Sequence, residues 1–171
     1  STEVVTFPIQ QCANRFILSA EVDADFAGDL YDGKSTTGYI LRTQVGTFAW
    51  GSKKQNLIAM STTESEYQAA TLVGRNLVWA RGLLSEVGFE ITHPSPIYED
   101  NNGCIALAET NVLHERSKHF IVHASWIRQR VIDTKELTFI RVPSQDNTAD
   151  LLTKALARPL FYKFRMQAGV L

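Results

Sequence analysis

Apolar residues gather in four short stretches before the first long helix, and each stretch has the length and residue types of a β-strand. Residues 16–22 form the first stretch and residues 36–43 the second. Residues 47–50 follow a short turn at Val45 and Gly46, and residues 56–60 form a fourth extended stretch. We therefore expect three strands in an antiparallel meander, with the fourth stretch extending or kinking the last of them.

A long helix follows the meander. Ser61 and Glu64 form a capping box and Gly88 provides a stop, so the helix is predicted over residues 61–87. An apolar stripe at helical spacing predicts its core-facing side: Ala69, Ala70, Val73, Leu77, Ala80 and Leu84. Glu66 falls on this stripe. Either it is buried and needs a partner or a metal ion, or it is exposed in the first turn and only complements the helix dipole.

The second half of the chain alternates between strands and helices. We expect strands at residues 96–99 and 136–142, helices at 104–109 and 115–132, and a last helix that is capped by Asp146 or Asn147 and pauses at Pro159. Added to the meander, this order predicts an α/β fold with a mixed sheet and helices on its faces. In such sheets, ligands gather at the carboxyl ends of strands.

Four carboxylates lie where different predicted elements begin or end. Asp23 and Asp100 end two strands, Glu66 is in the first turn of the long helix, and Asp150 is in the first turn of the last helix. Only a fold could bring them together, and gathered carboxylates repel unless a cation neutralises them. Oxygen ligands of this kind suit Mg²⁺ or Mn²⁺, and a pair of such ions hydrolyses phosphodiesters.

Composition narrows the classes of protein without deciding among them. The chain has 171 residues, 44% hydrophobic and 20% charged, with a net charge of −1, which is ordinary for one globular domain. A free-standing nucleic-acid binder would carry a basic surplus, so any such affinity must come from a local patch, from metal ions or from an attached domain. Cys12 and Cys104 form no C-x-x-C pair, so we expect free thiols and no zinc site. No stretch is apolar enough to span a membrane.

Seven segments in this order resemble the ribonuclease H domain of copia-type long-terminal-repeat retrotransposon Pol polyproteins. The segments are residues 23–29, 34–39, 52–55, 61–67, 100–101, 114–119 and 149–154. The likeness covers nearly everything from Phe16 onward, and seven ordered segments are far more specific than one short motif. The resemblance implies a ribonuclease H-like fold with a five-stranded mixed sheet and helices on both faces.

The same resemblance implies an activity and a setting. Members of the family cleave the RNA strand of RNA–DNA hybrids during reverse transcription, and the domain follows a reverse transcriptase in one polyprotein. We expect residues 1–171 to be a single domain, with residues 1–15 as an irregular lead-in. The first residue is Ser1 rather than Met, so we expect a piece of a longer polypeptide. The implied location is the cytoplasm, within a virus-like particle, or the nucleus. The oligomeric state is left open.

Residue by residue, the resemblance implies two Mg²⁺ ions, for which Mn²⁺ can substitute. Asp23 bridges both ions, Glu66 and Asp100 complete one site, and Asp150 completes the other. The products would carry a 5′ phosphate and a 3′ hydroxyl. Asp25 shares a strand face with Asp23 and is a candidate for supporting it from outside the metal site.

Candidate substrate contacts are of two kinds. Thr62, Thr63 and Asn102 match the family's minor-groove contacts. The alternative is that they only stabilise turns and cap helices. Phosphate contacts are expected from four basic residues that could equally be solvated surface: Lys53, Lys54, Arg116 and Lys118. Packing or capping is the expected role of His114 and His119, and the core is the expected place of Trp50, Trp79 and Trp126.

Departures from the family pattern bear on these expectations. Glu99 replaces the usual Cys before the third aspartate, and alternation should turn it to the opposite face, away from any metal. Gly33 replaces an Arg and Ser125 a His, and residues 142–147 lack the His that many relatives have. Two alternatives are a catalytically weak module that binds hybrid or braces a polymerase, and a different nuclease or integrase-like enzyme. Retention of all four carboxylates disfavours the catalytically weak module. Integrase-like enzymes usually carry their glutamate in a late helix, so the position of Glu66 early in the chain disfavours that alternative.

Overall fold

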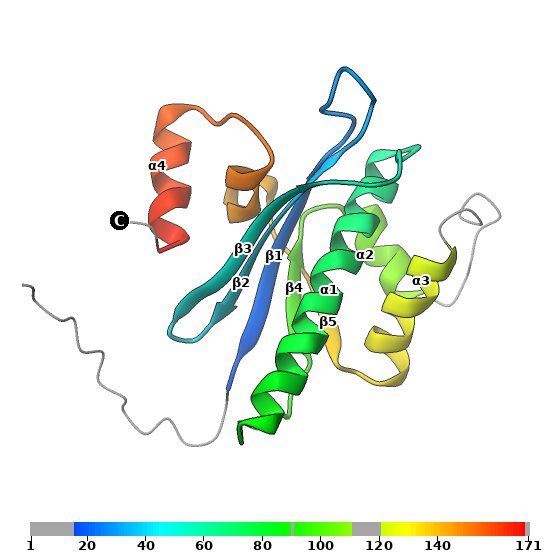
Figure 1. The fold of residues 1–171 in the computed structure, drawn as a ribbon, viewed down its shortest axis with the longest axis vertical. Helices are drawn as coiled ribbons and strands as arrows, with labels where there is room; N and C mark the ends of the chain where they lie inside the picture. Colours follow the sequence, from blue (N-terminus) through cyan, green and yellow to red (C-terminus); the bar gives the residue numbers. More distant parts are fainter. Residues whose placement is uncertain (1–15, 90, 111–120, 170–171) are drawn as a thin grey trace, which may run out of the picture.

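A five-stranded mixed sheet forms the centre of the molecule (Figure 1). The structure is a computed structural model that describes residues 16–89, 91–110 and 121–169. The strands are β1 (Leu18–Asp25), β2 (Thr36–Thr43), β3 (Gly46–Lys54), β4 (Ser95–Glu99) and β5 (Leu137–Arg141), in the spatial order β3-β2-β1-β4-β5. The first three strands are antiparallel, and β4 and β5 run parallel to β1. The predicted fold class is confirmed.

Helices cover both faces of this sheet. The described helical segments are α1 (Thr62–Glu86), α2 (Asn102–Glu109), α3 (Ile121–Arg128), the π turn η2 (Gln129–Asp133), the 3-10 turns η3 (Ser144–Asp146) and η4 (Thr148–Leu152), and α4 (Arg158–Gln167). Figure 1 shows α1, α2 and α3 on one side of the sheet and α4 on the other. The turn η4 contacts β1, β2 and α4, and so lies between the sheet and α4. None of the described helices combines the length and apolar character needed to cross a membrane.

Alternation along β1 divides its side chains between the two faces. Leu18, Ala20 and Val22 are buried in the hydrophobic core with the predicted stripe of α1. Glu21 and Asp23 point the other way, toward η4, where the Glu21 carboxylate accepts hydrogen bonds from Arg42 and from the Thr148 amide. One strand therefore supplies apolar residues to the core under α1 and acidic residues to the opposite face.

Three expected elements differ in the structure. Residues 56–60 form a loop rather than a fourth extended strand, because the chain must turn into α1, and the Met60 amide donates to the Glu64 carboxylate as part of the cap. The expected last helix is split into η4, capped by Asn147, and α4, in which Pro159 occupies the first turn. The start of the helix expected at 115–132 lies outside the described residues, and its end is the π turn η2.

The tryptophan prediction is wrong for two of three residues. Trp50 on the edge strand β3 and Trp79 on the outer side of α1 are both 67% exposed. Only Trp126 packs against the hydrophobic core. An aromatic residue on an edge strand has one neighbouring strand instead of two, and this explains why β-propensity did not translate into burial for Trp50.

Candidate metal centre

Two aspartates meet at the carboxyl ends of adjacent parallel strands. β1 and β4 pair in parallel with Ala20 opposite Ile97 and Glu21 opposite Tyr98, so Asp23 and Asp100 come out at the same end of the sheet. Asp23 is 1% exposed, whereas Asp100 is half-buried. The sheet topology thus brings two carboxylates together from positions far apart in sequence.

Glu66 joins them from the first turns of α1. Ser61 caps this helix, and its hydroxyl accepts a hydrogen bond from the Glu64 amide at 3.1 Å. The cap fixes the start of the helix, which directs Glu66 inward, and Glu66 is only 7% exposed. One carboxylate oxygen from each of Asp23, Glu66 and Asp100 lies within 4.8 Å of the others. Of the two interpretations open from sequence, the structure supports the buried one.

The cluster is electrostatically unbalanced without a cation. Burial, followed by the charges of Glu99, Asp23 and Asp100, raises the pKa of Glu66 to about 10. The Glu66 Oε2 atom is buried and has no hydrogen-bond partner among the residues that the structure describes. An unpaired buried oxygen amid two further carboxylates is the environment that a hard divalent cation would relieve, so the donor set fits a divalent metal ion.

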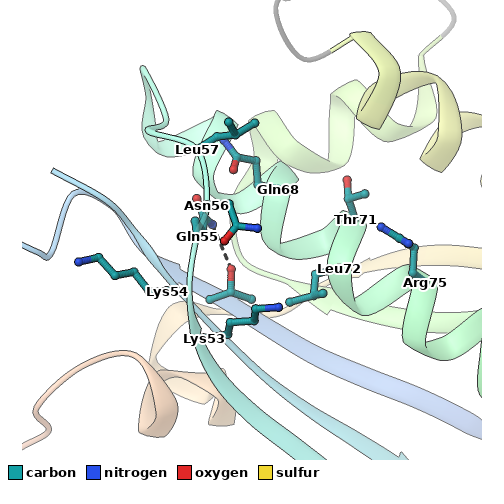
Figure 2. Close-up of a pocket in the computed structure, with 10 residues that line it drawn as sticks. Lys53, Lys54, Gln55, Asn56, Leu57, Gln68, Thr71, Leu72 and Arg75 are labelled. Atoms are coloured by element: carbon teal, nitrogen blue, oxygen red, sulfur yellow. Dashed lines mark hydrogen bonds between the residues drawn. The ribbon is translucent and has the colours of Figure 1, made fainter. Parts of the chain in front are cut away.

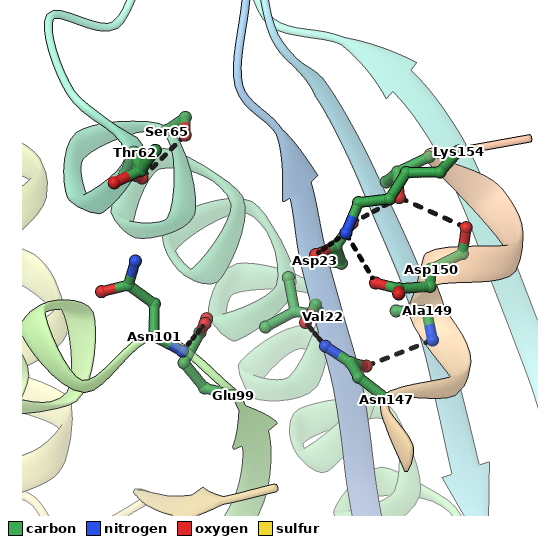
Figure 3. A network of polar contacts seen from close by, with 11 residues as sticks. Val22, Asp23, Thr62, Ser65, Glu99, Asn101, Asn147, Ala149, Asp150 and Lys154 are labelled. Atoms are coloured by element: carbon green, nitrogen blue, oxygen red, sulfur yellow. Dashed lines mark hydrogen bonds and ion pairs between the residues drawn. The ribbon is translucent and has the colours of Figure 1, made fainter. Parts of the chain in front are cut away.

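Asp150 approaches Asp23 from the other side but lies outside this group of three. Figure 3 shows the Lys154 side chain reaching between the two aspartates. The Lys154 Nζ atom is 3.2 Å from Asp23 Oδ1 and 2.9 Å from Asp150 Oδ1. The Thr153 hydroxyl also donates a hydrogen bond to Asp23. Asp23 is therefore shared between the cluster of three and a second pair with Asp150, which is now bridged by an ammonium group.

Burial is the largest single influence on the pKa values of Asp150 and Lys154. It raises the pKa of Asp150 to about 6, even though the hydrogen bond from Lys154 acts in the opposite direction. For Lys154, burial lowers the pKa, but the charges of Asp23 and Asp150 outweigh it and the pKa rises above its ordinary value. The ammonium therefore remains charged at neutral pH.

Asn147 and Gly38 hold η4 against the sheet. The buried Asn147 side chain donates to the Val22 carbonyl at 2.8 Å and accepts from the Ala149 amide at 3.2 Å (Figure 3). Gly38 lies opposite Asp23 on β2, and a Cβ atom there would be 2.6 Å from Thr153 and 2.9 Å from the Ala149 carbonyl. These contacts hold η4, which carries Asp150, close to the strands β1 and β2.

Glu99 does alternate away from Asp100, but the face it turns to is not remote from the site. It is fully buried on the α1 side, accepts a hydrogen bond from the Asn101 amide at 2.9 Å, and contributes to the raised pKa of Glu66. Burial raises the pKa of Glu99 itself well above its usual range. It is not one of the three clustered carboxylates, yet it is near enough to influence the protonation of Glu66. Asp25 is also outside the cluster, and its carboxylate lies against Gly28.

The expected minor-groove residues lie at the adjoining N-terminal ends of α1 and α2. Thr62 is exposed, Thr63 is half-buried with its hydroxyl 3.5 Å from the Asn101 side-chain oxygen, and Asn102 is exposed. The Asn102 side-chain oxygen accepts a hydrogen bond from Arg141 at 2.6 Å. Arg141 thereby adds a basic group beside Asn102 that sequence reasoning did not identify.

The expected phosphate contacts divide into two described and two undescribed residues. Lys54 forms ion pairs with Asp29 and Asp32, whereas Lys53 forms none within the described part of the chain. Lys53 and Arg75 line a pocket of about 360 Å³ between the end of β3 and α1 (Figure 2). Its lining contains amide, hydroxyl and basic side chains and no acidic one. Arg116, Lys118, His114 and His119 lie outside the described residues.

Sequence reasoning missed the residues that arrange Asp150. Lys154, Thr153 and Asn147 all contact the acidic groups or the turn that carries them. The spacing of four residues between Asp150 and Lys154 was a signal for their pairing, because such residues are neighbours on a helical turn. Nothing local indicated that Lys154 would also reach Asp23, which is 131 positions away.

Retrotransposon Pol polyproteins from plants match most of the chain. It is 39% identical over 158 residues to the retrovirus-related Pol polyprotein from transposon RE2 of Arabidopsis thaliana, and 38% identical over 145 residues to that from transposon TNT 1-94 of Nicotiana tabacum. These alignments cover 92% and 85% of this chain and 11% of each polyprotein. The chain thus spans about a ninth of the length of those relatives. No protein-family model matches it.

Solved structures share the fold. Ribonuclease H1 from compost, LC11-RNase H1, aligns with a TM-score of 0.53 at 16% identity, covering 82% of this chain and 94% of that one. Ribonuclease H1 of Halobacterium salinarum aligns with a TM-score of 0.51 at 18% identity, covering 80% and 93%. A further structure shows LC11-RNase H1 in complex with an RNA/DNA hybrid, with a TM-score of 0.52 at 15% identity, covering 81% and 94%.

Proposed function

Because this chain is a homologue of copia-type retrotransposon Pol polyproteins and has the ribonuclease H fold, we propose that it is a metal-dependent endonuclease that cleaves the RNA strand of RNA–DNA hybrids. It would act as part of a longer polyprotein, joined to a reverse transcriptase and working in the cytoplasmic particle where reverse transcription takes place. Attachment would supply a high local concentration of hybrid, which suits a chain whose net charge of −1 provides no general attraction to phosphates.

The observation that carries this proposal is the meeting of Asp23, Glu66 and Asp100 within 4.8 Å at the strand ends. These three would hold one divalent ion, and Asp23 with Asp150 would hold a second. When bound, a pair of Mg²⁺ or Mn²⁺ ions would lower the pKa of the attacking water and neutralise charge on the phosphodiester. The protein supplies the rigid arrangement, since β1, β4, α1 and η4 each fix one carboxylate.

Substrate contacts would come from the surface beside the cluster. Thr62, Thr63 and Asn102 would offer hydroxyl and amide groups to the 2′-hydroxyls and base edges of a minor groove, and Arg141, which donates to Asn102, would add a positive charge. Lys53 is available for a backbone phosphate, whereas Lys54 is already neutralised by Asp29 and Asp32. Recognition of the hybrid would therefore rest on groove shape and a few charges.

Hydrolysis of matched substrates tests the proposal. We expect the chain to cut the RNA strand of a labelled RNA–DNA hybrid in Mg²⁺ or Mn²⁺, and to leave a DNA duplex of the same sequence intact. Asp23→Asn and Asp100→Asn should each lower the rate by at least about 100-fold, since each removes a ligand charge. Asp146→Asn is the control, because this exposed aspartate pairs with exposed Lys163 and with no other cation among the residues that the structure describes.

Three results would contradict the proposal. Cutting that survives in both ligand variants would exclude these carboxylates as the active centre. Tight binding of hybrid without cleavage at any divalent ion concentration would instead favour a non-catalytic binding module, and equal cutting of duplex DNA would favour a nuclease of another specificity.

A further inference from the structure

The ammonium group of Lys154 lies between the carboxylates of Asp23 and Asp150. Its Nζ atom lies 3.2 Å from one carboxylate and 2.9 Å from the other, while the two aspartate side chains are 2% and 11% exposed. Removing both charges from water is unfavourable unless a cation lies between them. Lys154 meets that need from within the chain.

The position of the ammonium coincides with the place where a second divalent ion would be held. An ion bound by oxygens of both Asp23 and Asp150 would have to lie between these oxygens, and Lys154 Nζ already occupies that space. An ammonium and a divalent cation within a few ångströms of each other repel strongly, so both cannot be there together. Occupation by one therefore excludes the other.

The Lys154 side chain can move away from the two aspartates. Lys154 is 39% exposed although its Nζ atom contacts two largely buried groups. It follows η4, so its flexible stem can turn toward solvent without unfolding the turn that carries Asp150. In the cluster of Asp23, Glu66 and Asp100, Lys154 pairs with Asp23 alone, and within the described part of the chain neither Glu66 nor Asp100 forms an ion pair.

We propose that Lys154 is a built-in substitute for the second divalent ion: it stabilises the metal-free site and must leave before that ion binds. This inference rests on the proposed function, because it assigns Asp23 and Asp150 to the second ion. It predicts that the two ions bind unequally. The ion held by Asp23, Glu66 and Asp100 enters without displacing a side chain, whereas the ion at Asp150 competes with the ammonium.

Calorimetric titration with MnCl₂, in the absence of nucleic acid, tests this directly. We compare the wild-type chain with Lys154→Met, which keeps the stem and removes the charge, and with Lys154→Gln as a second neutral variant. Lys163→Met is the control, since Lys163 pairs with a different and exposed aspartate at 2.8 Å. Thermal unfolding in EDTA and in Mn²⁺ is measured for the same proteins.

We expect a tight and a weaker Mn²⁺ site in the wild type, and the weaker site to bind about 10-fold more tightly in both neutral variants. In EDTA, the same variants should unfold about 3–8 °C lower than the wild type, and saturating Mn²⁺ should remove the difference. Lys163→Met should change neither quantity.

The outcomes separate this inference from the proposed function. If the wild type binds two ions and the neutral variants bind the second no more tightly, Lys154 does not compete and the inference is wrong. If no Mn²⁺ binds to the wild type, or if Asp23→Asn binds it equally well, the metal assignment itself fails and this inference fails with it.

Discussion

Glu66→Gln should stabilise the metal-free protein, although it removes a residue from the centre of the site. Glu66 is 7% exposed, its Oε2 atom has no hydrogen-bond partner among the described residues, and three acidic side chains surround it. Its pKa is raised from 4.5 to about 10, so the folded chain must keep a proton that the unfolded chain releases. Glutamine has nearly the same shape and carries no charge to be neutralised.

The size of the effect follows from proton linkage. Each pH unit between pH 4.5 and pH 10 lowers the stability of the metal-free fold by at most about 1.4 kcal/mol, because the folded state binds more protons than the unfolded state. From pH 4.5 to pH 8 the upper limit is about 5 kcal/mol. Since neighbouring carboxylates share the proton, we expect the glutamine variant to be more stable than wild type by about 2 kcal/mol at pH 8 and by little near pH 5.

Urea unfolding in EDTA at pH 5 and pH 8, followed by tryptophan fluorescence, measures this difference. Glu86→Gln is the matched control, because Glu86 is an exposed residue at the end of the same helix. The free energy of unfolding of Glu86→Gln should stay within about 0.5 kcal/mol of the wild-type value at both pH 5 and pH 8. If Glu66→Gln proves less stable than wild type at pH 8, or if its advantage does not grow with pH, Glu66 is not held protonated by its neighbours.

Three other perturbations probe the surroundings of the site. Asn147→Ala leaves the Val22 carbonyl and the Ala149 amide without their partner, so we expect a loss of about 1–3 kcal/mol in urea unfolding and weaker Mn²⁺ binding in calorimetry. Gly38→Ala should push η4 from the sheet and lower Tm by several degrees; an unchanged Tm would mean that the contact is easily relieved. Lys53→Ala should reduce the salt dependence of hybrid binding by about one charge, and Lys54→Ala should have less effect, as fluorescence anisotropy at several salt concentrations would show.

The long helix could be predicted from local chemistry because its signals agree. Ser61 and Glu64 mark the start, Gly88 marks the end, and the apolar stripe fixes the buried side. Once that stripe is known, the inward direction of Glu66 follows. What local pattern cannot give is the neighbour across the sheet, so whether Glu66 met other carboxylates depended on the pairing of β1 with β4.

The geometry around Asp150 could not be predicted for the same reason. A lysine four residues after an aspartate is usually an exposed pair of little consequence. Here η4 lies against β1 and β2 and carries Lys154 to Asp23, which makes that pair part of a buried site. Trp50 illustrates the opposite error, because an aromatic residue on a strand suggests burial until the strand proves to be an edge.

Anomalous scattering from Mn²⁺ in crystals of the wild-type chain tests the metal assignment most directly. We expect one peak in contact with the carboxylates of Asp23, Glu66 and Asp100, and, at higher Mn²⁺ concentration, a second between Asp23 and Asp150 with Lys154 turned away. Saturating Mn²⁺ that gives no peak at these carboxylates, or peaks only elsewhere on the molecule, would contradict it.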